Sequence, residues 1–174
     1  MSSIIKCNTY QDANGNALFS SDGSGNVTLS AGDLKSTPAF FVQLSGHQSI
    51  SNATDTKVLL DSKQIDTDNA FSSNKFTVPS GQAGKYFITV CIQRNGWGSN
   101  RLVAFIKKNG TQIWTVENFS GATYACAVGS GLFDLAVSDY LELWVYHDNG
   151  FTQSIRGNSS NSFTFMGGYK LIGA

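Results

Sequence analysis

Hydrophobic residues along this chain occur in short runs that alternate with polar residues, and clusters of Gly, Asn, Ser and Asp separate the runs. The spacing of an amphipathic helix is almost nowhere sustained, whereas runs rich in Val, Ile, Phe, Tyr and Thr recur. Such runs between turn residues are typical of β-strands. The sequence therefore predicts an all-β fold. From Pro38 onward the expected strands cover 39–44, 57–60, 63–67, 75–78, 85–93, 102–108, 111–116, 124–128, 131–136, 140–147 and 162–172.

Turn residues support this division into strands. Asn109-Gly110 lies between two alternating runs, and this pair best tolerates the positive φ values of a type I′ hairpin turn. The segments 94–96 and 148–150 also end in Asn-Gly and are expected to be loops. Pro79 cannot donate to a sheet ladder and is expected to end a strand.

The run 140–147 has two unlike faces. Tyr140, Glu142, Trp144 and Tyr146 alternate with the aliphatic residues between them. An antiparallel sheet commonly turns a polar face toward water. Aromatic residues on the second face therefore predict a subunit interface or a ligand platform.

The first 37 residues differ in kind from the rest. Turn-rich stretches separate very short apolar patches, which are too few to build a core. We therefore expect residues 1–37 to be an extended N-terminal arm that adds short strands to a neighbour, and residues 38–174 to be the folded domain. The apolar residues expected to anchor the arm are Ile4, Ile5, Leu18, Phe19, Val27 and Leu29.

Composition narrows the possible function classes. The chain has 174 residues, of which only 14% are charged, and its 12 basic side chains balance its 12 acidic ones. The sequence has no stripe of basic residues of the kind that binds nucleic acid or an anionic membrane. Its 41% of hydrophobic residues argues against disorder. A surface with near-zero net charge favours association. No signal peptide or membrane span is expected, so synthesis in the cytoplasm is expected.

Catalytic groups are scarce in the sequence. An esterase GxSxG motif is absent, and only His47 and His147 could act as the base of a Ser-His-Asp triad. Cys91 and Cys126 lie in apolar runs, where free thiols are expected to pack as small hydrophobic residues. We predict no catalytic site and no cofactor.

Acidic residues offer two candidate cation sites, and both are weak. The loop that begins at Asp12 lacks the glycine and glutamate positions of a calcium loop. Asp61, Asp66 and Asp68 could gather oxygen ligands if their loops converged, but solvated strand ends explain them better. No metal is therefore predicted.

Trp97 stands between two glycines in a predicted loop. It could stack on a sugar or a partner protein, or it could fold back and cap the sandwich. His147, Phe151 and Arg156 lie in or beside the other long predicted loop. They could join Trp97 in a receptor-binding surface, or they could be ordinary loop packing.

Several motifs follow one another in a fixed order from Pro38 onward. They are Pro-Ala-Phe-Phe-Val at 38–42, Lys-Phe-Thr-Val-Pro at 75–79, Gly-Lys-Tyr-Phe-Ile at 84–88, the Asn-Gly strand at 102–110, the leucine-rich stretch 132–143 and the closing strand 162–171. In this order they resemble the jelly roll of the complement C1q and tumour necrosis factor (TNF) family. The resemblance implies a jelly-roll β-sandwich that is not catalytic, forms homotrimers and binds partners through loops and flanks. The residues expected at the trimer contact are Phe40, Tyr140, Trp144, Phe165 and Tyr169.

Residues 4–34 contain the phrases Asn-Thr-x-x-Asp-x-Asn-Gly and Ser-Asp-Gly-Ser-Gly-Asn-Val-Thr-Leu. They resemble the leading segments of structural proteins from marine and cyanobacterial tailed phages. The resemblance implies a location in the virion, as a trimeric fibre, knob or appendage that is attached to other virion proteins and contacts a host-surface glycan or protein. The alternatives are a capsid decoration protein, a free carbohydrate-binding module and a hydrolase.

Overall fold

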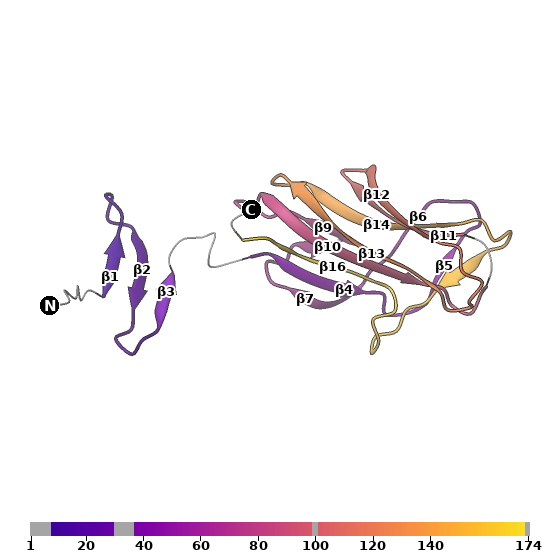
Figure 1. Ribbon diagram of the computed structural model, residues 1–174, viewed down its shortest axis with the longest axis horizontal. Coiled ribbons are helices and arrows are strands. Elements are labelled where there is room, and N and C mark those ends of the chain that lie inside the picture. The colour runs from indigo at the N-terminus through magenta and orange to yellow at the C-terminus, as the bar shows by residue number, and fades with distance from the viewer. Residues whose placement is uncertain (1–7, 30–36, 99–100, 173–174) are drawn as a thin grey trace. The chain divides into compact units, whose positions relative to one another are not determined.

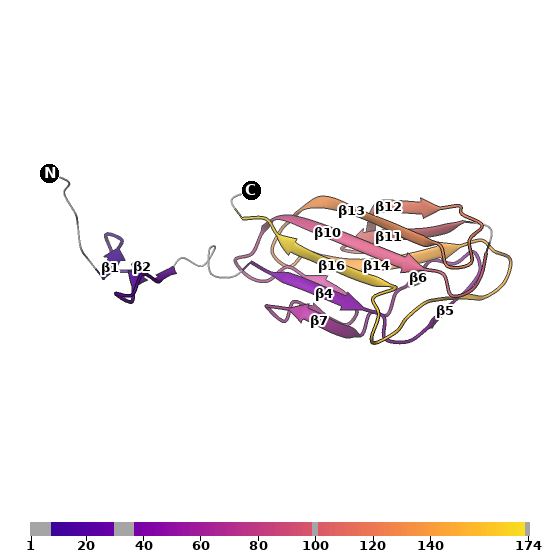
Figure 2. The same ribbon diagram turned by 60° about the horizontal axis from the view of Figure 1, so that its bottom comes forward.

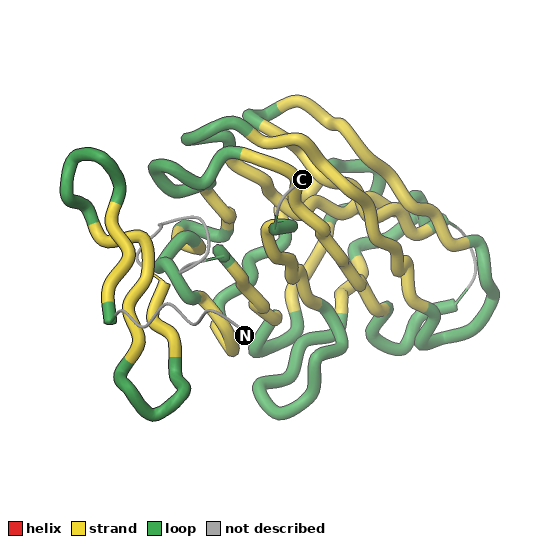
Figure 3. Tube along the Cα trace, turned by 60° about the vertical axis from the view of Figure 1, so that its left-hand side comes forward, coloured by secondary structure: helices red, strands yellow, loops and turns green. Residues whose placement is uncertain are grey.

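The computed structural model describes residues 8–29, 37–98 and 101–172. Their backbone consists of strands, turns and loops (Figure 3), which confirms the all-β prediction. By its contacts the chain divides into two units, Met1–Thr37 and Pro38–Ala174. No helix of membrane-spanning length and hydrophobicity occurs among the described residues.

The first unit holds a small antiparallel sheet with two turns of one kind. Its strands are β1 (Thr9–Gln11), β2 (Ala17–Ser21) and β3 (Val27–Leu29), in that order. In each turn an Asp carboxylate accepts hydrogen bonds from two backbone N–H groups and from the side-chain amide of the Asn four residues later. The bond from the Asn side chain is the largest effect that lowers the pKa of Asp12 and of Asp22. The Asp12 loop is therefore a self-capped hairpin turn.

The second unit is a sandwich of two antiparallel sheets (Figure 1). The five-stranded sheet has the order β13 (Cys126–Leu135), β10 (Gly84–Gln93), β16 (Phe165–Lys170), β4 (Ala39–Gln43) and β7 (Ser62–Asp66), and Figure 2 shows these strands side by side. The six-stranded sheet has the order β12 (Thr111–Asn118), β11 (Leu102–Lys108), β14 (Tyr140–His147), β9 (Lys75–Thr77) and β8 (Phe71–Ser72), with β6 (Thr56–Lys57) paired to β14. A separate pair joins β15 (Gln153–Ile155) to β5 (Gln48–Ile50).

Alternation along the strands builds the core between the two sheets. On β10, Tyr86 and Ile88 are fully buried while their chain neighbours point outward, and the aliphatic positions of β14 face inward in the same way. Phe40 of β4 stacks on Phe76 of β9 with ring centroids 4.3 Å apart. Each fully buried side chain of this size stabilises the fold by roughly 1.5–3 kcal/mol.

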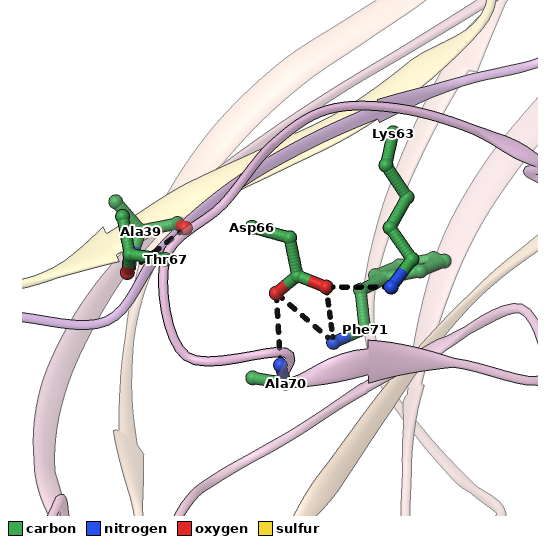
Figure 4. Close-up of polar contacts among 6 residues, drawn as sticks. All are labelled: Ala39, Lys63, Asp66, Thr67, Ala70 and Phe71. Atoms are coloured by element: carbon green, nitrogen blue, oxygen red, sulfur yellow. Dashed lines mark hydrogen bonds and ion pairs between the residues drawn. The ribbon is translucent and has the colours of Figure 1, made fainter.

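A tight turn organised by Asp66 carries the chain from β7 in one sheet to β8 in the other. Its carboxylate accepts hydrogen bonds from the backbone N–H groups of Ala70 and Phe71 and from the ammonium group of Lys63, at 2.8–3.3 Å (Figure 4). Asp61 lies apart from this turn and accepts bonds from the backbone N–H and the hydroxyl of Ser45. Both carboxylates cap local structure, and the Asp66 side chain is only 5% exposed, so it is a buried cap and not the solvated strand end that the sequence suggested.

Most predicted strands are present in the structure. The runs 102–108 and 140–147 coincide with β11 and β14, and Asn109 and Gly110 have φ values of 51° and 84°, which confirms the positive-φ turn. The strands β5, β8 and β15 were not predicted because two or three residues carry no readable alternation.

The predicted break between 124–128 and 131–136 is wrong, because β13 continues through it. Gly129 and Gly131 suggest a turn from sequence alone. In the structure they make room for aromatic rings, since a Cβ on Gly129 would lie 2.7 Å from the ring of Trp114. Close packing against β12 of the other sheet, and not a change of direction, explains these glycines.

Candidate functional site

Most of the outer face of the five-stranded sheet is an uncharged and largely apolar surface, and the charged pair Lys85 and Asp134 borders it at one end. Cross-strand pairing sets three rows across β13, β10, β16 and β4, and they consist of Leu132, Phe87, Tyr169 and Ala39; then Ser130, Thr89, Gly167 and Phe41; then Val128, Cys91, Phe165 and Gln43. None of these twelve positions carries a charge. We call this surface the apolar face.

Large side chains on the apolar face are exposed in the single chain. Leu132 is 63% exposed, Val128 58% and Tyr169 48%, and Ile65 of the adjoining strand β7 is 51% exposed. The rings of Phe87 and Tyr169 lie 5.5 Å apart, so the exposed groups are contiguous. Contiguous exposed apolar surface on a soluble protein marks an interaction site.

Two glycines make the centre of the apolar face concave. A hollow of about 240 Å³ lies between the rings of Phe41, Phe87 and Tyr169, with Gly167 and Gly168 in its lining. A Cβ on Gly167 would lie 2.7 Å from the Phe41 ring, and a Cβ on Gly168 would lie 2.5 Å from the carbonyl oxygen of Phe87. The Gly-Gly pair therefore sets both the shape of the hollow and the inward packing of β16.

The outer face of the six-stranded sheet is also aromatic, but cations of the same chain cover its rings. The ammonium group of Lys107 lies 3.8 Å from the ring centroid of Trp144, and that of Lys75 lies 4.4 Å from the ring of Tyr140. The guanidinium group of Arg101 lies 4.9 Å from the ring of Tyr146. Each such cation–π contact contributes roughly 0.5–1 kcal/mol at an exposed site. We call this surface the capped face.

Carboxylates balance the cations of the capped face. Lys107 lies 3.7 Å from Asp55, and Lys57 donates to Glu142 at 2.7 Å. Burial favours a higher pKa for Glu142, but the hydrogen bonds from Lys57 and Trp144 outweigh it and lower the pKa. Cations of the same chain thus partly cover the rings of the capped face, and carboxylates pair with Lys107 and Arg101.

The five residues expected at the trimer contact are divided among three places. Phe165 and Tyr169 lie on the apolar face. Phe40 is 2% exposed and packs in the core, so the expectation that it contacts a neighbour is corrected. Tyr140 and Trp144 lie on the capped face, on the opposite side of the sandwich from Phe165 and Tyr169, and their place at the trimer contact stays a prediction.

The sequence analysis missed most of the apolar face. Phe41, Phe87 and Leu132 were read only as parts of predicted strands. A signal was present, because Phe87 stands at the alternate position between Tyr86 and Ile88 and must point away from the core if they point inward. Ten alternating residues with apolar groups on both faces predict a strand that is covered on both sides.

Trp97 caps the end of the sandwich opposite to the start of β4. We call this end the far end and define it as the segments 94–98, 118–125 and 147–154. Its side chain is 6% exposed, and its Nε1 donates a 2.6 Å hydrogen bond to the carbonyl oxygen of Ser154. The guanidinium group of Arg94 stacks over the indole at 4.8 Å, and the His147 ring lies 5.1 Å away. His147 is fully buried. The expectation that Trp97 and His147 contact a receptor is corrected in favour of the packing role.

Other aromatic residues are exposed at this end instead. Phe151 is 75% exposed, Phe119 is 69% exposed and Tyr124 is 52% exposed. Phe119 and Tyr124 were not predicted from the sequence. Arg156 is half-buried, with its guanidinium group 3.7 Å from the ring of Phe163 and 5.1 Å from that of Tyr124. Phe151 therefore keeps its place as a surface candidate, and Arg156 serves mainly to order neighbouring rings.

The candidate anchoring residues of the arm have mixed positions. Ile4 and Ile5 lie outside the described residues. Leu18 is 46% exposed and Val27 is 60% exposed. Phe19 is half-buried under the ring of Tyr10, with centroids 4.3 Å apart, and Leu29 pairs with Phe19 across β2 and β3.

Each of the two histidines forms a hydrogen bond with a backbone group of another segment. The Nδ1 atom of His47 accepts the backbone N–H of Gly157, and His147 binds the carbonyl oxygen of Ile50 through Nε2 at 3.2 Å. Ser45 donates to Asp61 and not to a histidine. In residues 8–29, 37–98 and 101–172 no group of three or more His, Cys, Asp or Glu is arranged to hold a metal ion.

No protein-family model matches the sequence, and no curated protein matches it either. Solved structures resemble the sandwich in fold at low sequence identity. The globular domain of zebrafish complement 1qA has 18% identity and a TM-score of 0.55, over 77% of this chain and 97% of that one. Murine APRIL has 12% identity and a TM-score of 0.60, over 78% and 100%. The vertex protein P5 of PRD1 has 16% identity and a TM-score of 0.60, over 78% and 96%. With two sheets, this strand order and these likenesses, residues 38–174 have the C1q/TNF-like jelly-roll fold.

Proposed function

We propose that this protein is a non-enzymatic structural subunit of a tailed-phage virion. It assembles as a homotrimer through the apolar face, is fixed to the particle by its first unit and presents the far end to the host surface. The observation that carries the proposal is the uncharged apolar face, which is exposed in the single chain. An exposed surface of this kind favours association in water.

The apolar face offers two different patches, as a contact between neighbouring subunits around a threefold axis would require. In a ring, each subunit offers one patch to one neighbour and a different patch to the other. The hollow at Gly167 is one patch, and the exposed side chains of Leu132 and Val128 on the edge strand β13 are the other. Insertion of these side chains into a neighbour's hollow would close three subunits around one axis.

Light scattering of the purified full chain tests the trimer. The expected mass is three times the 18.7 kDa of one chain. A mass of one chain at micromolar concentration contradicts the trimer. A mass of two chains contradicts threefold closure but retains the apolar face as the contact.

Two observations support a role in a virion. The fold is shared with a viral vertex protein. The first unit contains the sequence motifs that resemble phage structural proteins, and it exposes Leu18 and Val27 on its small sheet. A sheet of three very short strands is near the lower limit for independent stability, and apolar cover from a particle would stabilise it.

Antibody labelling of purified virions in electron micrographs tests the location. Label on the tail supports a fibre, knob or appendage, whereas label spread over the capsid supports the decoration protein. Virions that carry no label contradict both. Full-length protein with Val27→Asp should lose its place on the particle if the first unit is the anchor, while Thr28→Asp is the matched control on the opposite face of the same strand.

Host contact is assigned to the exposed rings of the far end. Phe119, Tyr124 and Phe151 are aromatic groups of the kind that dominate recognition energetics. Binding of the full chain to host cells should fall when Phe151 is replaced by Ser, and it should not change for Val137→Ser away from this end. Equal binding by both variants contradicts the assignment.

A further inference from the structure

Cys91 and Cys126 lie on neighbouring strands at the far-end half of the apolar face. In the ladder of β10 and β13, Cys91 pairs with Val128 and Gln93 pairs with Cys126. The two cysteines are therefore diagonal neighbours on one face of an antiparallel pair. Such neighbours lie farther apart than directly opposed residues but remain within side-chain reach.

The thiol of Cys91 is buried beside that of Cys126. Burial, and then the neighbouring Cys126 thiol, raise the pKa of Cys91 to about 12. Cys91 is 8% exposed and so is shielded from solvent. Cys126 is more accessible, and its Sγ receives a 3.3 Å hydrogen bond from the side-chain amide of Gln93.

We propose that Cys91 and Cys126 are a redox-active pair that closes into a reversible disulfide with a small disulfide, such as oxidised glutathione, as the oxidant. The Cys126 thiolate attacks one sulfur of the oxidant, forms a mixed disulfide and releases one glutathione thiolate. Cys91 then loses its proton to water and attacks Sγ of Cys126, which forms the internal bond and releases the second glutathione. Two cysteine thiols are oxidised and one disulfide is reduced to two thiols.

The diagonal geometry predicts that this bond is easily broken. A disulfide needs its two Cβ atoms about 3.8 Å apart, which is closer than diagonal positions on a regular sheet. The strain favours reduction, as in labile and regulatory disulfides. The bond would tie the edge strand β13 to β10 beside Val128. The chemistry rests only on the fold of the single subunit, in which Cys126 is accessible.

Thiol mapping on the full-length protein tests the pair. After incubation with oxidised glutathione and alkylation, we expect two of the three thiols to be lost and one peptide link between Cys91 and Cys126, which reduced glutathione reverses. Cys91→Ser should stop at the mixed disulfide on Cys126, and Cys126→Ser should leave Cys91 unmodified. Cys7→Ser should behave like the unsubstituted protein.

The outcomes separate this proposal from the proposed function. A link through Cys7, prior reaction of Cys91, or retention of all three thiols overturns the redox pair, whatever the mass in light scattering. A monomer that still forms the Cys91–Cys126 link overturns the trimer and leaves the pair intact. Urea unfolding under non-reducing conditions should show a higher midpoint for the linked protein, and an unchanged midpoint overturns the cross-strand link.

Discussion

The two outer faces of this sandwich are both aromatic, but they differ in whether charged side chains of the same chain contact their rings. On the capped face, Lys107 covers Trp144 and Asp55 balances Lys107. On the apolar face, Phe87 and Tyr169 contact each other and no charged residue stands in the three rows around them. Aromatic residues on a second sheet face thus do not by themselves indicate an interface. What decides is whether neighbouring strands of the same chain supply groups that cover the rings.

The largest effect is expected when charge is placed on the apolar face. Replacing Leu132 and Tyr169 by Glu would bury like charges three times in a trimer, and each unfavourable juxtaposition costs several kcal/mol. We expect the mass in light scattering to fall from three chains to one, with an unchanged circular dichroism spectrum. Ile113→Glu, at a 41% exposed position on the outer side of β12, is the control. A trimer that survives the double substitution would mean that the apolar face is not the contact.

The adjacent glycines of β16 separate folding from assembly. A Cβ on Gly168 meets backbone and the Ile88 side chain within the sheet, so Gly168→Ala should destabilise the single subunit by roughly 1–3 kcal/mol. A Cβ on Gly167 meets mainly the Phe41 ring and fills the outer hollow. Gly167→Ala should therefore weaken association more than unfolding stability. Urea unfolding and sedimentation measure the two effects, and identical behaviour of both variants would contradict the assignment of one glycine to each side.

Removal of one cation from the capped face should have a smaller effect. Lys107→Ala loses its contacts with the rings of Trp144 and Phe105, and the loss should be roughly 0.5–1 kcal/mol of unfolding free energy. Lys107→Arg should retain most of it, because a guanidinium group also stacks on indole. Neither variant should change the mass in light scattering. A change in mass would show that the capped face takes part in assembly.

Acid should affect the turn that contains Asp139 before it affects the apolar face. Asp139 accepts hydrogen bonds from Lys108, Asn109 and the backbone of Ala136, which lower its pKa to about 2 from 3.8. Because the pKa is lower in the folded state, this stability is fully present above about pH 3.8 and is lost as pH falls through about 2. With allowance for solvent screening, we expect a loss of roughly 1 kcal/mol in unfolding free energy over that window, and Asp139→Asn should remove this part of the pH dependence. Trimer dissociation, which involves no carboxylate in the three rows, should not follow the same curve.

The strand pattern was readable where each segment contains its own information. β11 and β14 coincide with the alternating runs because side-chain alternation is a property of the strand itself. Asn109-Gly110 forms its turn because these residues tolerate positive φ locally. The glycines of β13 misled the prediction because their cause, the Trp114 ring, lies on another strand.

The candidate site was less predictable because it depends on which residues meet across strands. Trp97 between two glycines looks like an exposed anchor until Arg94 and Ser154, from separate segments, enclose it. The rings of Tyr140 and Trp144 look uncovered until Lys75 and Lys107 pack against them.

By itself, the sequence determined the all-β class, the strand alternation, the self-contained turns and a charge balance that permits association, since each of these depends on local chemistry or on totals. Tertiary structure alone decided which aromatic surface stays bare. Register places Phe87 beside Tyr169 and leaves uncharged side chains around them, while it places Lys107 over Trp144. Pairing between distant segments fixes these neighbours, and a side chain's exposure is a property of its neighbours and not of its own residue type.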